Sequence, residues 1–100
     1  MQKKSYRAVG ELLKSVRKKR GLRQRHAGDM MGVTYAYVSR IEKGEVQLRR
    51  GDMQERLAKF LGISTGALGF LLHDIPDELT GDDVKSYEKI REKITTSCIQ

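Results

Sequence analysis

Residues 35–43, YAYVSRIEK, place two aromatic hydroxyls, an aliphatic hydroxyl and two cations around one short predicted helix. Helical periodicity turns Val38 and Ile41 inward. The side chains left facing solvent are those of Tyr35, Ala36, Tyr37, Ser39, Arg40 and Lys43. Arg40 has no acidic neighbour one turn earlier, so its guanidinium is free to donate two parallel hydrogen bonds to a planar pair of acceptors. Amphipathic rings flanked by cations suit the groove of a polyanion better than plain solvent.

The patterns that commonly carry catalysis are missing from the chain. There is no phosphate-cradling GxxxxGK[S/T], no HExxH and no nucleophile elbow. The glycines at 62, 66 and 69 lack a lysine and a preceding strand, so close helix packing explains them better. Cys98 is the single cysteine, and with two scattered histidines it forms no plausible zinc site. We therefore expect no enzymatic activity, no bound metal and no cofactor.

Charge is distributed unevenly along the 100 residues, whose formal net charge is +7. Residues 1–60 hold sixteen Lys/Arg and six Asp/Glu, whereas residues 61–100 hold four and seven. A basic body with an acidic tail suggests a polyanionic partner for the body, although charge alone does not separate nucleic acid from an anionic membrane face or a solvated surface. No apolar run approaches the roughly 20 residues of a spanning helix, and one cysteine fits a reducing compartment. We expect a cytoplasmic protein with no membrane contact.

Apolar periodicity predicts five short helices, a sixth C-terminal helix and no strand, so the expected fold class is all-α. Thr34 is expected to cap the third helix, and Ser64 to cap the fifth. Asp52 is expected to cap the fourth, with Glu55 in a capping-box position. We expect residues 1–75 to form one domain and residues 76–100 to form a connector followed by the last helix. The predicted helices are about 6–20, 24–31 and 35–43, one between Asp52 and Gly62, residues 65–72, and about 82–96.

The residue types at five positions that follow Gln24 each have a steric explanation. Gly28 allows a close approach of two crossing helices, and Gly32 tolerates the positive φ that a short turn needs. Apolar residues then wedge the following helix onto the body. They are Val33, Val38 and Ile41. This spacing is the helix-turn-helix pattern, with one helix at about 24–31 and the next at about 35–43.

Residues 22–44, LRQRHAGDMMGVTYAYVSRIEKG, resemble the helix-turn-helix of Cro/C1-type regulators, the phage-repressor-like or XRE family. Residues 57–68, LAKFLGISTGAL, are similar to the fourth-helix end and fifth-helix start of that fold. Arg23 stands where the family usually has a Ser or Thr cap. The resemblance spans about residues 8–72 and implies a five-helix lambda-repressor-like DNA-binding domain, here with an additional C-terminal helix.

The resemblance also implies a set of DNA contacts, because the third helix of such domains enters the major groove. Tyr35, Ala36 and Arg40 would face the bases. Thr34, Ser39 and Lys43 would lie at the groove edge toward phosphates. Gln24 would donate to a phosphate from the N-terminus of the second helix, and Arg25 joins this contact set.

Three further residues have two interpretations each. Tyr37 either reaches DNA or packs its ring against the second helix. Arg49 and Arg50 either clamp the DNA backbone or belong to a solvated loop.

The resemblance implies a sequence-specific regulator of transcription, a repressor that binds double-stranded DNA as a homodimer on a palindromic operator. The dimer surface is expected on the fifth helix, the C-terminal helix or both. The stripe of Tyr87, Ile90 and Ile94 fits packing across a two-fold axis and packing on its own chain equally well. The alternative is an antitoxin-like module whose C-terminal helix binds a partner protein.

Overall fold

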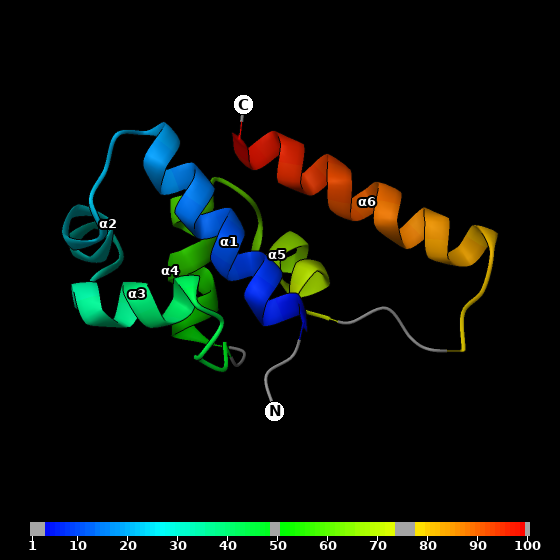
Figure 1. The fold of residues 1–100 in the computed structure, drawn as a ribbon, viewed down its shortest axis with the longest axis horizontal. Coiled ribbons are helices and arrows are strands. Elements are labelled where there is room, and N and C mark those ends of the chain that lie inside the picture. The colour runs from blue at the N-terminus through cyan, green and yellow to red at the C-terminus, as the bar shows by residue number, and fades with distance from the viewer. Residues whose placement is uncertain (1–3, 49–50, 74–77, 100) are drawn as a thin grey trace.

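The computed structural model describes residues 4–48, 51–73 and 78–99. Within these ranges the chain forms six α-helices and no strand (Figure 1). The all-α, lambda-repressor-like fold with an additional C-terminal helix is confirmed. The helices are α1 (Lys4–Lys19), α2 (Gln24–Met31), α3 (Tyr35–Glu42), α4 (Asp52–Leu61), α5 (Thr65–Leu72) and α6 (Asp82–Ile99).

The core takes one apolar stripe from each of the first five helices. Leu13 of α1, Ile41 of α3 and Leu57 of α4 are fully buried, and Leu68 of α5 packs into the same cluster. Ala27 supplies the contact from α2. Because side chains three and four residues apart share a helix face, each short helix can bury a stripe and keep its other side in solvent.

Two of the three predicted helix caps are confirmed, and the third is wrong. Thr34 Oγ1 accepts a hydrogen bond from the Tyr37 N–H, and Ser64 Oγ accepts one from the Ala67 N–H, each at 3.1 Å. Asp52 is not a cap: Gly51 holds the N-cap position of α4, with no side-chain cap bond. Gly51 has φ +129°, which L-residues rarely adopt, and this lets α4 start one residue earlier than predicted.

The carboxylate of Asp52, which is not used as a cap, forms an ion pair instead. It lies 2.9 Å from a guanidinium nitrogen of Arg56, one turn along α4. This position remains favourable for a carboxylate, since it faces the positive end of the helix dipole.

The sequence predicts that both methionines of α2 lie in the core or at its edge, and Met30 departs from this prediction. Met31 is buried, but Met30 is 64% exposed. Ala27 and Met31 are four residues apart and share a face, whereas Met30 is rotated about 100° away from Met31 around the helix. Because α2 is short and lies on the protein surface, it buries only the face that carries Ala27 and Met31.

Helix α6 packs against its own chain, which is one of the two arrangements that the sequence allowed for its apolar stripe. The Tyr87 and Phe70 rings stack with their centroids 5.4 Å apart. Lys19 Nζ donates to the Ile99 carbonyl and Arg91 donates to the His73 carbonyl. These contacts tie both halves of α6 to α1 and α5.

Two side chains show that the rest of the protein buries α6 only in part. Cys98 is buried near the C-terminal end of α6, and this burial raises the pKa of its thiol, opposed by the nearby charge of Arg20. Ile90 remains 46% exposed. Across the described residues, no helix is long and apolar enough to cross a membrane.

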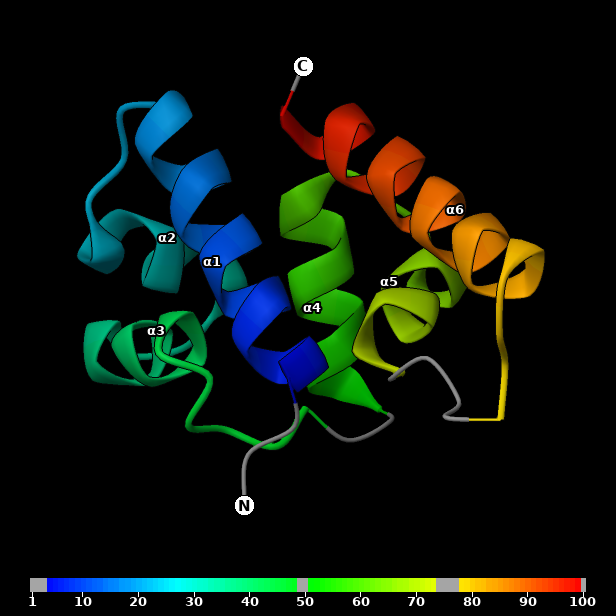
Figure 2. The same ribbon diagram turned by 45° about the vertical axis from the view of Figure 1, so that its right-hand side comes forward.

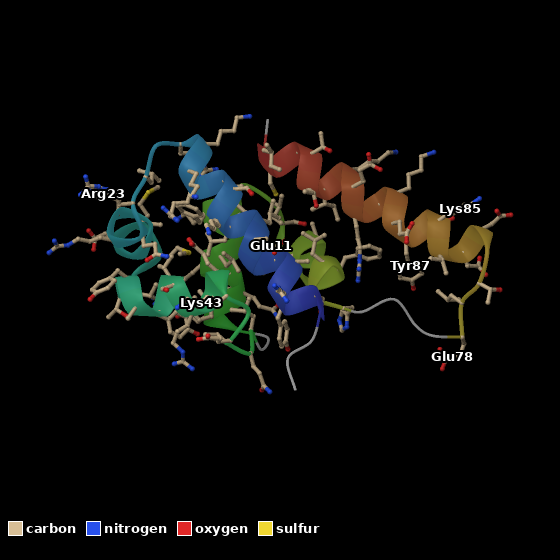
Figure 3. The ribbon with its side chains drawn as sticks, in the orientation of Figure 1. Glu11, Arg23, Lys43, Glu78, Lys85 and Tyr87 are labelled. Carbon is tan, nitrogen blue, oxygen red and sulfur yellow. The ribbon has the colours of Figure 1, made fainter. Side chains whose placement is uncertain are left out.

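The two ends of the molecule carry different elements. Figures 1 and 2 both show α2 and α3 at one end of the long axis and the N-terminus of α6 at the opposite end. In Figure 3, Arg23 and Lys43 lie at the first end, while Glu78, Lys85 and Tyr87 lie toward the second.

Candidate DNA-binding surface

The turn between α2 and α3 is tight because two glycines permit it. Gly32 ends α2 with φ +72°, and the Val33 N–H donates to the Gly28 carbonyl at 2.8 Å. A Cβ on Gly28 would lie 2.6 Å from the Val33 carbonyl oxygen, so no side chain fits there. The steric roles predicted for both glycines are thus present, with the crowding at Gly28 coming from the turn backbone.

Helix α3 is held along its inner face. Val38 and Ile41 are buried in the core, and the Thr34 hydroxyl caps the helix at its start. Tyr37 is half-buried, and its ring packs against the core cluster. For Tyr37 this contact supports the structural interpretation over the DNA-contact one.

A buried ion pair fastens the C-terminal end of α3 to α1. Arg17 Nε donates to Glu42 Oε2 at 2.7 Å, and a second guanidinium nitrogen donates to Oε1 at 3.1 Å. The Arg17 and Glu42 side chains are only 10% and 4% exposed. Arg17 also donates to the Leu22 carbonyl at 2.9 Å. From the sequence, Arg17 is expected in the last turn of the first helix, and Glu42 is expected to have a structural role, holding a nearby arginine or a backbone N–H. The pair with Arg17 gives Glu42 that role.

Gln24 extends this network to the N-terminus of α2. Its side-chain amide donates to Glu42 Oε1 at 3.2 Å, and the residue is half-buried. The amide has two N–H groups, so one is used inside the protein and the other remains for an outside acceptor. The three residues connect α1, α2 and α3 at a single point.

The outer face of α3 carries side chains that take no part in these anchors. Tyr35 is 63% exposed, and Ala36, Arg40 and Lys43 are exposed as well. Among the described residues, the Arg40 guanidinium forms no ion pair. Ser39 is half-buried between the two faces. Within the part of the chain that the structure describes, the cations predicted on this face, Arg40 and Lys43, therefore have no competing ion pair.

A shallow hollow of about 650 Å³ joins the starts of α2 and α3. It brings the predicted residues Gln24, Arg25 and Tyr35 together and adds Arg17 and Arg23. Arg23 is exposed at the N-cap of α2 and forms no side-chain cap bond, so the first N–H groups of α2 lack that partner. The hollow thus combines exposed cations with the positive end of a helix dipole, a combination that binds anions.

Comparison with known proteins agrees with this geometry. A family model described as a helix-turn-helix domain matches residues 8–68. The chain belongs to the helix-turn-helix domain family. No curated protein and no solved structure gives a significant match.

In this helix-turn-helix domain the structure adds Arg23 to the residues chosen from the sequence. The signal was available, because Arg23 replaces the usual Ser or Thr cap with a cation, but it was interpreted only as a lost cap. Arg49 and Arg50, the possible backbone clamp, lie outside the described residues. Of the remaining predicted contacts, Gln24, Arg25 and Tyr35 line one hollow, and Ala36, Arg40 and Lys43 are exposed on α3.

Proposed function

We propose that this helix-turn-helix protein is a Cro/C1-type transcriptional repressor, which binds a palindromic operator in double-stranded DNA as a homodimer. One observation carries the proposal. The outer face of α3 presents Tyr35, Ala36 and Arg40 to solvent, while its inner face and its end are held by the core and a buried ion pair.

The exposed face of α3 has the donors and apolar groups that base edges require. Arg40 can donate two hydrogen bonds to guanine O6 and N7, worth roughly 1–3 kcal/mol of discrimination. The Ala36 methyl fits against a thymine methyl, and the Tyr35 ring packs on base edges. These three residues would read sequence.

A second group of residues would hold the DNA backbone. Arg23, Gln24 and Arg25 surround the start of α2, where helix N–H groups also point outward. Thr34, Ser39 and Lys43 flank the base-reading face. Because each phosphate contact releases counterions, affinity should fall steeply with salt, with a log–log slope of about −0.9 per phosphate neutralised.

The length of α3 supports a dimer. Eight residues rise about 12 Å, which covers only a few base pairs. Two copies on half-sites one helical turn apart, about 34 Å, double the contact set. The exposed face of α5 is our proposed dimer surface, since a hollow of about 710 Å³ beside it is lined by Gly66, Gly69 and Phe70, among others.

Selection of binding sites from random duplex DNA tests the proposal. The wild-type chain should enrich a palindromic site, and Arg40→Ala should lose one specified base per half-site and bind roughly 10–100-fold more weakly. Lys85→Ala removes an exposed cation from the opposite end of the molecule and is the charge-matched control (Figure 3). Enrichment of no sequence at low salt would contradict the proposal.

An antitoxin-like module is the second candidate. It is favoured by the exposed Ile90 on α6, which offers an apolar contact for a partner protein on a helix already attached to the domain. If duplex selection fails while the chain binds a protein partner and Ile90→Ser abolishes that binding, this second function replaces the first.

A further inference from the structure

The backbones of α1 and α3 touch at Gly10, in the middle of α1. A Cβ at this position would lie 2.2 Å from the Ile41 carbonyl oxygen and 2.8 Å from the Glu42 carbonyl oxygen. Both oxygens belong to the last turn of α3, so no side-chain rotation can relieve the overlap. Only a shift of one helix against the other could accommodate a methyl group at Gly10.

Gly44, which follows α3, makes a second close contact with the backbone of α1. It has φ +74°, and a Cβ on it would lie 2.9 Å from the Cα of Arg7 and 3.1 Å from the Arg7 nitrogen. Gly21 has a similar φ of +70°, but a Cβ added there would have no other atom within 4 Å. Gly21 is thus needed for its conformation alone, whereas Gly44 is needed for conformation and for space.

Both contacts act on the C-terminal end of α3, the end that Arg17 also holds. Tyr35 and Ala36 lie toward the other end of α3, with Tyr35 about 9 Å from Ile41 along the helix axis, whereas Arg40 directly precedes Ile41 in the held turn. Hydrogen bonds to base edges fail when donor and acceptor move from about 2.9 Å to 3.6 Å apart. A displacement of α3 by about 1 Å therefore removes direct readout without unfolding the helix.

We propose that Gly10 and Gly44 are positioning residues for DNA readout: their missing side chains set how closely α1 seats the recognition helix and so fix where its outer face stands. This inference rests on the proposed function. It assigns specificity to two residues that lie on the inner side of α3 and touch no DNA. Phosphate contacts should depend less on this seat, because the attraction of cations to a polyanion needs less exact geometry than a hydrogen bond to a base edge.

The first experiment compares Gly10→Ala with the reverse exchange Ala8→Gly, at an exposed position two residues earlier in α1. Gly10→Ala raises helix propensity and Ala8→Gly lowers it. We expect Gly10→Ala to bind the selected operator roughly 10–100-fold more weakly and nonspecific duplex within about twofold of wild type. Ala8→Gly should keep the wild-type ratio of specific to nonspecific affinity.

That ratio separates positioning from loss of fold. An unfolded fraction lowers binding to operator and to nonspecific duplex by the same factor, whereas a displaced α3 lowers only the first. If Gly10→Ala does not fold, Gly44→Asn is the milder variant, because Asn tolerates a left-handed conformation and its Cβ would lie 2.9 Å from the Arg7 Cα, against 2.2 Å from the Ile41 oxygen for a Cβ at Gly10. Its matched control is Gly21→Asn, which has the same backbone conformation in open space.

A double-mutant cycle adds a readout that a purely structural role would not change. If α3 is displaced, Arg40→Ala should cost at most about twofold more on the Gly10→Ala or Gly44→Asn background, against its full effect in wild type. Additive losses would overturn the proposal, as would operator binding equal to that of the controls. Failure of the wild-type chain to select any sequence would instead overturn the proposed function.

Discussion

Helices α3 and α6 are attached to the same body in different ways. α3 has eight residues, and its end is held by a buried ion pair and by backbone contacts at Gly10. α6 has eighteen residues, but among its described side chains only Cys98 is buried. It is also linked by a ring stack with Phe70, by two side-chain donors to carbonyls, and by the half-buried Ile94 and Ile99 packed against the core.

The comparison distinguishes a helix held in an exact position, α3, from a helix that is only kept attached to the body, α6. Contacts between backbones leave α3 almost no freedom to shift, which suits a helix whose outer side chains must meet fixed acceptors. Contacts made by flexible side chains hold α6 near the body and can be released without moving the rest. Three substitutions test this comparison.

The largest effect is expected from Glu42→Ala, which leaves the Arg17 guanidinium buried without its partner. Breaking a buried pair in this way costs about 3–5 kcal/mol of unfolding free energy, measured by urea denaturation. Glu11→Ala is the control, because its 4.0 Å pair with Arg7 is exposed and worth less than about 1 kcal/mol. Equal losses in the two variants would mean that α3 is not anchored by this pair.

A smaller effect is expected from Tyr87→Ala, which removes the ring stack beneath α6. The loss should be about 1–2 kcal/mol, with the transition of the first five helices little changed. Cys98 reports the release, since its thiol should react faster with a maleimide when α6 detaches. Glu88→Ala, at the exposed neighbouring position, is the control.

The pH profile of this labelling follows from the same burial. Burial raises the pKa of the Cys98 thiol, so less reactive thiolate is present at neutral pH than for a free cysteine. In Tyr87→Ala that pKa should return toward its ordinary value, and the labelling profile should shift to lower pH. An unchanged profile would show that α6 stays docked without the stack.

The smallest effect on stability is expected from Thr34→Ala, which removes the N-cap of α3 and costs about 1 kcal/mol. Ser64→Ala removes the equivalent cap of α5 and should cost a similar amount. Operator binding should distinguish them, because Thr34 starts the helix proposed to read bases. Equal operator binding by the two variants would mean that the cap of α3 does not contribute to base recognition.

The sequence was sufficient where a structural cause is local. The bounds predicted for α2 agree with Gln24–Met31, since Gly32 closes the helix within the same short segment. The caps Thr34 and Ser64 were found because each bonds an N–H three residues away. The helix-turn-helix itself was recognised from spacings of this kind.

The sequence was insufficient where the cause lies far along the chain. Glu42 pairs with Arg17 across 25 residues, and periodicity compares only neighbours within about one turn. The stripe containing Tyr87 fitted two arrangements, and Phe70 on α5 selects one of them. The seat at Gly10 has no local signal at all, because α3 supplies the crowding atoms.

The division of α3 into an anchored side and an outward side has an evolutionary consequence. Positions 35, 36 and 40 are exposed, and none of them belongs to the core, the cap or the ion pair. Codons at these positions can therefore change without compensating repair elsewhere in the gene. A combinatorial library randomised there should yield mostly folded proteins, and under the proposed function these proteins should differ in the DNA sequence that they select.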